Sequence, residues 1–161
     1  MEITSTGGWR KDPVESPNDW DSIFEEGFEA ESDNFQNAGN KIVSNKYHTR
    51  ASSARVRRRQ KLKSAEKIIS EYRDLMVDFY YYSQGMEEGE SFTLEIKMDS
   101  SAWTEVGRWT RGEDFENDEW YPGTVTVPNG KDNALFRFSG QGNQGNDKIY
   151  IDNITFSRKF E

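Results

Sequence analysis

Apolar residues alternate with polar residues along several segments of the chain, and this period of two constrains the fold more than any other feature. Phe92, Leu94, Ile96 and Met98 are each separated by one polar residue. Side chains of a strand point alternately to its two faces, so this pattern predicts strands with one buried face. Strands are expected at residues 41–43, 54–57, 75–82, 92–98, 103–109, 120–127, 134–138 and 148–156. Short strands separated by turn residues predict an all-β fold, a two-sheet antiparallel jelly-roll sandwich.

Residues 65–76 are ambiguous. Ile68, Tyr72 and Leu75 fall at helical spacing, and Ser64 stands where a helix N-cap would be, so the stretch alone predicts a helix. From Leu75 onward the apolar residues alternate instead, which predicts a strand.

The length of 161 residues fits one domain with one core. Residues 1–20 contain glycines, prolines and charges, and they are expected to form a poorly ordered lead-in. Residues 21–157 are expected to form the sandwich, and residues 158–161 a short tail. Hydrophobic residues are only 33% of the chain, but aromatic residues reach 14%, and their large rings can fill a core.

Charge and rare residue types exclude several functions. The net charge of -8 disfavours binding to nucleic acid or to anionic membranes. The chain has no cysteine, which excludes disulfides and thiolate catalysis, and His48 is its single histidine. No carboxylate pair stands out as a catalytic pair, so we expect no enzyme. No apolar run approaches the ~20 residues of a membrane span, so no membrane insertion is expected.

Several short motifs occur in an order that is similar to known jelly rolls. They are F-E-E-G-F at 24–28, L-M-V-D-F-Y-Y-Y-S at 75–83, M-E-E-G-E-S-F-T-L-E at 86–95, W-T-E-V at 103–106, F-R-F at 136–138 and D-K-I-Y-I-D-N-I at 147–154. Together they resemble the MAM-like and carbohydrate-binding-module-like (galactose-binding-like) jelly-roll domains. The tryptophan usual after the first strand is replaced by Phe35, and the MAM cysteines are absent. The resemblance favours strand or turn over helix at 65–76.

The resemblance implies a non-catalytic binding module of an extracellular or cell-surface protein, with a polysaccharide or glycoprotein as partner and other domains in a larger chain. One alternative is an adhesive or structural domain for protein–protein contact. Another is a small cytosolic or viral jelly-roll protein that assembles into a larger particle. The chain opens with no visible signal peptide, which fits either a cytosolic protein or a domain taken from a longer secreted chain.

The resemblance also implies a structural calcium ion where the first strand meets the last. Its ligands would be the carboxylates of Glu25 and Asp152, completed by backbone carbonyls around Arg50 and Ser53. Calcium takes six to eight oxygen ligands, which such a set supplies. The alternatives are that Asp152 caps a turn through backbone amides or pairs with Arg50.

Exposed aromatic side chains are candidates for a carbohydrate platform, because sugar rings present apolar C–H faces to an aromatic ring. Five residues are candidate ligand contacts: Tyr80, Tyr82, Trp109, Trp120 and Tyr121. The alternative for each is packing in the core or between strands. Trp103 is expected in the core.

A basic run extends from Arg55 to Lys63, with six positive charges in nine residues and no negative charge. Such a run is typical of a solvated edge strand that discourages edge-to-edge pairing. The functional interpretation is a patch for an anionic partner, such as a sulfated or acidic polysaccharide.

Overall fold

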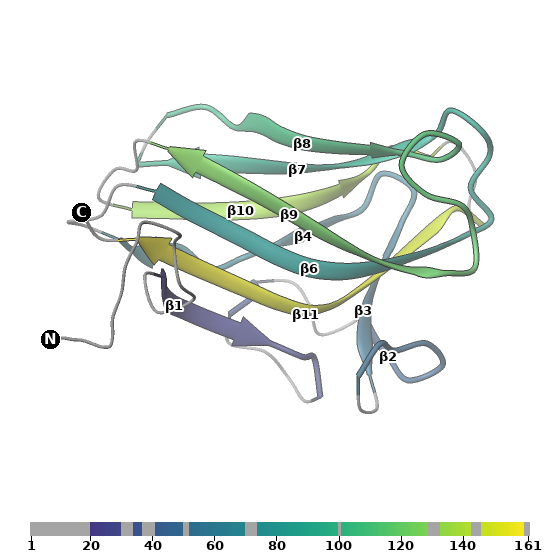
Figure 1. The fold of residues 1–161 in the computed structure, drawn as a ribbon, viewed down its shortest axis with the longest axis horizontal. Helices are drawn as coiled ribbons and strands as arrows, with labels where there is room; N and C mark the ends of the chain where they lie inside the picture. Colours follow the sequence, from purple (N-terminus) through teal and green to yellow (C-terminus); the bar gives the residue numbers. More distant parts are fainter. Residues whose placement is uncertain are drawn as a thin grey trace, which may run out of the picture.

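The computed structural model shows two antiparallel β-sheets that face each other (Figure 1). It describes residues 20–29, 34–36, 41–49, 52–69, 74–99, 101–128, 133–142 and 146–159. All regular elements of these residues are strands. Among them there is no helix of the length and apolarity that crossing a membrane requires. The predicted all-β, two-sheet fold is therefore confirmed.

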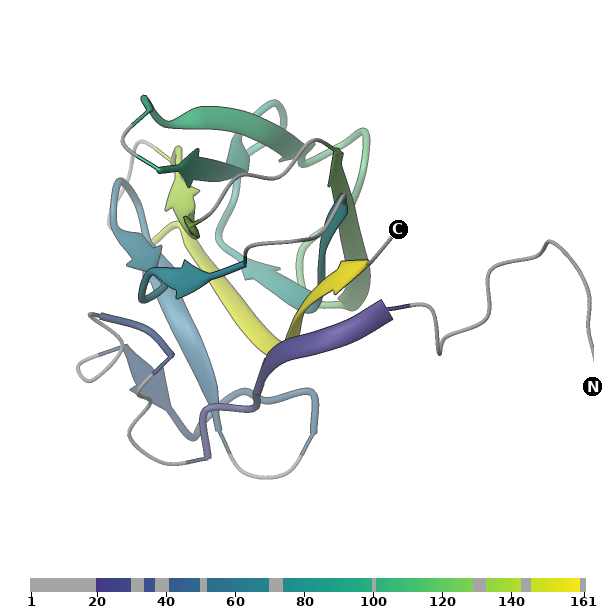
Figure 2. The same cartoon turned by 90° about the vertical axis from the view of Figure 1, so that its left-hand side faces the viewer.

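The six-stranded sheet is built around the last strand of the chain. Its order is β2 (Ile42–Val43), β3 (Ser53–Arg57), β11 (Lys148–Lys159), β6 (Asp74–Gln84) and β9 (Trp120–Pro128). The first strand, β1 (Trp20–Glu26), pairs with the C-terminal half of β11, as Figure 2 shows in purple and yellow. The first and last strands thus lie side by side.

The five-stranded sheet covers the other side of the core. Its order is β4 (Lys61–Lys63), β10 (Asn133–Gly140), β7 (Ser91–Met98) and β8 (Thr104–Thr110), and β5 (Lys67–Ile68) also pairs with β10. The basic run therefore crosses from one sheet to the other, because β3 and β4 belong to different sheets.

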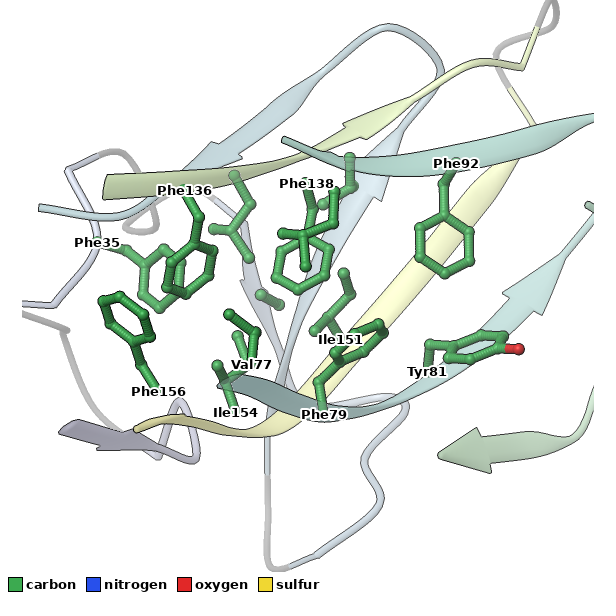
Figure 3. Packing of buried hydrophobic residues seen from close by; sticks show 14 of the residues in the cluster. Phe35, Val77, Phe79, Tyr81, Phe92, Phe136, Phe138, Ile151, Ile154 and Phe156 are labelled. Carbon is green, nitrogen blue, oxygen red and sulfur yellow. The ribbon is translucent and has the colours of Figure 1, made fainter. Parts of the chain in front are cut away.

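Aromatic rings fill the space between the sheets (Figure 3). Phe79 from the six-stranded sheet meets Phe138 from the five-stranded sheet edge to face, with ring centroids 4.8 Å apart. Such pairs add about 0.5–1.5 kcal/mol to the area they bury. Gly123 lies opposite Phe79 on β9, and a Cβ there would approach Phe79 Cζ to 2.5 Å, so this position has room only for glycine.

The described part of residues 65–76 contains β5 and the start of β6, joined to irregular residues, as the resemblance implied, and the helix that its spacing alone predicted is wrong. Ile68 in β5 is 76% exposed while Ile69 is fully buried, so these neighbours do not share one apolar helix face. Packing against β10 and the pairing of β6 override the local spacing. Residues 1–19 of the expected lead-in lie outside the described residues, and β11 continues to Lys159.

Candidate functional site

The outer face of the six-stranded sheet carries a row of aromatic side chains. Phe79 and Tyr81 of β6 point into the core, so Tyr80 and Tyr82 point outward. Tyr82 lies opposite Trp120 of β9, with ring centroids 5.4 Å apart. Tyr80 is one of the few large hydrophobic residues that the described part of the chain exposes, at 36%.

The loop between β2 and β3 folds over this row. His48, in the segment 44–49, stacks on Tyr80 with ring centroids 3.9 Å apart and planes 11° apart. The same imidazole meets Trp120 edge to face at 5.4 Å. Lys46 places its Nζ 5.0 Å from the centre of the Tyr82 ring, within range of a cation–π contact. We call His48, Tyr80, Tyr82 and Trp120 the aromatic platform.

The carboxylate of Asp152 holds this loop in place. Its Oδ2 accepts hydrogen bonds from the backbone N–H groups of His48 (2.9 Å) and Thr49 (3.1 Å), and its Oδ1 accepts one from Asn153 (2.8 Å). Asp152 is fully buried. Burial raises the pKa of Asp152, and the charge of Glu29 adds to this, while the three N–H donors act in the opposite direction.

A β-bulge shapes the strand beneath the loop. The register between β11 and β6 shifts between Asp152 and Thr155, and Asn153 has a left-handed φ of 52°. Bulges re-aim side chains and are frequent beside functional sites. Here the bulge brings Asn153 Oδ1 to 2.8 Å from His48 Nδ1, which fixes the orientation of the imidazole on Tyr80.

A groove begins at Tyr80 and continues along the same face. It encloses about 500 Å³. Its lining includes Asp78, Tyr80, Pro122, Thr124, Asn153 and Thr155. An aromatic surface next to hydroxyl, amide and carboxylate groups is the chemistry that a sugar requires: rings for its C–H faces and polar groups for its hydroxyls.

The structure separates the five predicted ligand contacts into two groups. Tyr80, Tyr82 and Trp120 come together on the outer face. Trp109 and Tyr121 instead pack on the core side, against Phe92 at 5.1 Å and Tyr81 at 5.6 Å. For Trp109 and Tyr121 the structure thus shows the alternative, packing against the core.

The strand register of β9 and the space beside Gly107 explain why Tyr121 and Trp109 face the core. Tyr121 follows Trp120 directly, so the two side chains point to opposite faces of β9. A Cβ at residue 107 would lie 2.6 Å from the Trp109 ring, so Gly107 leaves the space that this indole fills.

Sequence reasoning missed His48 and Lys46. They lie in a segment without periodicity, and only the distant Asp152 places that segment over the sheet.

Of the predicted calcium ligands, Glu25, Ser53 and Asp152 lie near this site. Glu25 is opposite Thr155 in the β1–β11 pair, so the end of β1 reaches the bulge. Ser53 is buried and its hydroxyl donates to the carbonyl of Lys46 at 2.6 Å. Arg50 lies outside the described residues. Asp152 makes the turn-capping bonds that were the alternative to calcium.

A polar pocket of about 340 Å³ lies between β1 and the bulge, lined by Glu25, Glu29, Thr49 and Asn153 among others. These oxygen donors are of the kind that calcium prefers. A carboxylate has about four lone-pair sites, so the three N–H donors leave Asp152 capacity for a cation. Within the described ranges, however, no three His, Asp or Glu side chains converge as a metal cluster.

The basic run divides between two surfaces. Arg57, Arg58 and Arg59 are exposed around the turn between β3 and β4. Lys61 and Lys63 flank the buried Leu62 in β4, so they point to the outer face of the five-stranded sheet.

No protein-family model matches the chain, and no curated protein matches its sequence. Solved structures match its fold. The CBM22-1 xylan-binding domain of Paenibacillus barcinonensis Xyn10C is 8% identical with a TM-score of 0.63, over 88% of this chain and 96% of that domain. TmCBM61 in complex with β-1,4-galactotriose is 14% identical with a TM-score of 0.53, over 89% of this chain and 90% of that one.

A third similar structure is the K3 cleaved adhesin domain of Lys-gingipain from Porphyromonas gingivalis, 15% identical with a TM-score of 0.57, over 85% of this chain and 99% of that domain. The protein therefore has the jelly-roll sandwich fold of carbohydrate-binding modules. At these identities the likeness concerns the fold alone.

Proposed function

We propose that the protein is a non-catalytic polysaccharide-binding module whose ligand lies on the aromatic platform and in the adjoining groove. The observation that carries the proposal is the outward-facing aromatic row, the exposed Tyr80 with the half-buried Tyr82 and Trp120, beside a groove with several polar side chains in its lining. Rings that stay exposed on a sheet face contribute little to the core, which indicates a role in binding.

The platform is organised before any ligand arrives. His48 stacks on Tyr80 and is itself held by Asn153, while its backbone N–H is held by the buried Asp152. Binding then costs little ordering of these rings, and a smaller ordering cost favours affinity.

Neutral β-linked polysaccharides are the first ligands to test, because similar folds are described as xylan-binding or bound to β-1,4-galactotriose. The full protein should bind xylan or galactan in affinity electrophoresis and calorimetry. Truncating a ring of the platform removes its stacking surface, so Trp120→Ala and Tyr80→Ala should each weaken binding at least tenfold, an effect of the size of an interface hot spot.

The matched control is Trp103→Ala. Trp103 contacts Arg137 of the five-stranded sheet, away from the platform, so this variant should bind neutral polysaccharides normally. All variants should keep their thermal transition. If the Trp120 and Tyr80 variants fold and bind as the wild type does, the platform is misplaced.

We also propose a structural calcium ion beside Asp152 and Glu25. The proposal is supported by the buried carboxylate of Asp152, whose pKa is raised by burial and by Glu29, and by the oxygen donors of the adjacent pocket. A cation there would relieve repulsion between these acidic groups.

Differential scanning calorimetry with excess calcium and with a chelator tests the ion. At 100 times its dissociation constant, a bound ion adds about 2.7 kcal/mol to the free energy of unfolding, which raises Tm by several degrees. The Glu25→Gln variant should lose this shift, whereas Glu105→Gln on the other sheet should keep it. Identical transitions with calcium and chelator would reject the ion.

Adhesion to a protein partner is the second candidate function, and the similarity to the cleaved adhesin domain favours it. A location outside the cell or on its surface, within a larger chain, fits both candidates and belongs to this proposal. A glycan array separates them: failure to bind any polysaccharide would favour the protein partner.

A further inference from the structure

The outer face of the five-stranded sheet carries a positive surface on an acidic protein. The side chains of β4, β7, β8 and β10 that alternate with core residues point away from the core. Five of them are cationic and two are acidic: Lys61, Lys63, Lys97, Arg108 and Arg137 against Glu95 and Glu105. The whole chain, by contrast, has a net charge of -8.

Arg137 is the centre of this surface. Its Nε donates to Glu95 Oε1 at 2.7 Å, and its guanidinium lies 4.1 Å from the centre of the Trp103 ring. Trp103 is only partly buried, so the expectation that it belongs to the core is wrong. The two terminal nitrogens of Arg137 donate to no acceptor among the residues that the structure describes.

A buried hydroxyl on the same face has no partner. Thr93 lies between Ser139 of β10 and Arg108 of β8, is 1% exposed, and its Oγ1 makes no hydrogen bond with the described residues. The hydroxyl of Ser139 beside it donates to Glu95 at 3.1 Å. An unpaired buried hydroxyl costs about 1–3 kcal/mol, so it calls for an explanation, and a ligand oxygen that pairs with it would supply one.

The neighbourhood of Thr93 can open. Arg108 lies opposite Thr93 and has a side chain that is 47% exposed, in an ion pair with the exposed Glu105. Exposed pairs of this kind contribute about 0–1 kcal/mol. Arg108 also donates from Nη1 to the hydroxyl of Ser91 at 2.7 Å, so a ligand that displaces Arg108 has to replace one weak ion pair and one hydrogen bond.

We propose that this face is a second polysaccharide site, specific for an anionic sugar, in which Arg137 binds a carboxylate or sulfate group and Thr93 binds a neighbouring oxygen. The planar guanidinium matches such groups with two parallel hydrogen bonds, and Lys61 and Lys63 add positive charge along β4. Trp103 offers a ring for stacking. This second site rests on the proposed polysaccharide-binding function and specifies the class of sugar, an anionic one. It shares no residue with the aromatic platform.

Binding of polygalacturonate, dextran sulfate and neutral xylan to the full protein tests the site. An anionic polymer should bind, and its affinity should fall as salt is raised. The polygalacturonate and dextran sulfate arms decide whether carboxylate or sulfate is preferred. Arg137→Gln should weaken anionic binding about tenfold, and Lys159→Gln, which removes one charge at the far end of the six-stranded sheet, should leave it unchanged.

Thr93→Val separates binding from folding. It removes the unpartnered hydroxyl and keeps the shape of the side chain, so Tm should stay equal or rise while anionic binding weakens about threefold to tenfold. Normal anionic binding by both Arg137→Gln and Thr93→Val would overturn the site, as would a wild type that binds xylan but neither anionic polymer. Loss of xylan binding alone in Trp120→Ala, with anionic binding kept, supports two separate sites.

If wild type binds the anionic polymers but not xylan or galactan, the aromatic platform fails as a site for these polymers and the second site stands. The failures of the two proposals are therefore distinguishable.

Discussion

At the scale of single residues, the ion pair of Glu95 with Arg137 stabilises the outer face of the five-stranded sheet. Burial alone would raise the pKa of Glu95 above its ordinary value of 4.5. The hydrogen bonds from Arg137 and Ser139 and the charges of Arg137 and Lys61 outweigh burial, and the pKa of Glu95 is lowered. Because the pKa of Glu95 is lower in the folded chain than its ordinary value of 4.5, the ionised carboxylate stabilises the fold above pH 4.5. This stabilisation is lost as the pH falls below 4.5 and through the lowered pKa of the folded chain.

The variant Glu95→Gln cannot ionise and should therefore be less stable than the wild type at neutral pH, by about 1–2 kcal/mol. The difference should shrink below pH 4.5, where the wild-type carboxylate becomes protonated as well. Chemical denaturation at neutral pH and at acid pH measures it. Glu105→Gln is the control, because its pair with Arg108 is exposed and should contribute little at any pH. An equal difference at both pH values would contradict the ion-pair account.

At the scale of elements, the strands could be predicted from the sequence and the site only in part. Alternation predicted β7 to within one residue, because the buried face of a strand repeats every second position. It also separates Tyr80 and Tyr82 from the core residues Phe79 and Tyr81, with which they alternate along β6. It does not say which face is exposed, so it cannot separate the inward-facing Trp109 from the outward-facing Trp120. The space beside Gly107, which the Trp109 indole fills, makes that difference.

The loop over the platform and the bulge in β11 could not be predicted. The segment 44–49 has no periodic pattern, and its place is set by Asp152, 104 residues away from His48. The left-handed φ of Asn153 depends on the register shift in β11, for which the sequence offers no local signal beyond the tolerance of asparagine for that conformation. Tertiary contacts decide both features.

At the scale of the whole molecule, the two proposed sites face away from each other. The aromatic platform lies on the outer face of one sheet and Arg137 on the outer face of the other. The aromatic core lies between the two sheets (Figures 1 and 3). Stacked sheets are about 10 Å apart, and residues that share no partner at such a separation contribute independently. The double variant Trp120→Ala/Arg137→Gln should therefore show the sum of the two single effects on binding.

Opposite sites also predict that one protein molecule joins two polysaccharide chains. A mixture of xylan and polygalacturonate should become turbid when the protein is added. The turbidity should rise at first and then fall once protein exceeds the available chains, because each chain is then occupied by separate protein molecules. Either Trp120→Ala or Arg137→Gln should abolish the turbidity, since a molecule with one working face cannot bridge. Lys159→Gln, at the far end of the six-stranded sheet, should retain it. Turbidity that persists in both single-face variants would mean that bridging depends on neither Trp120 nor Arg137, and it would contradict the two opposite sites.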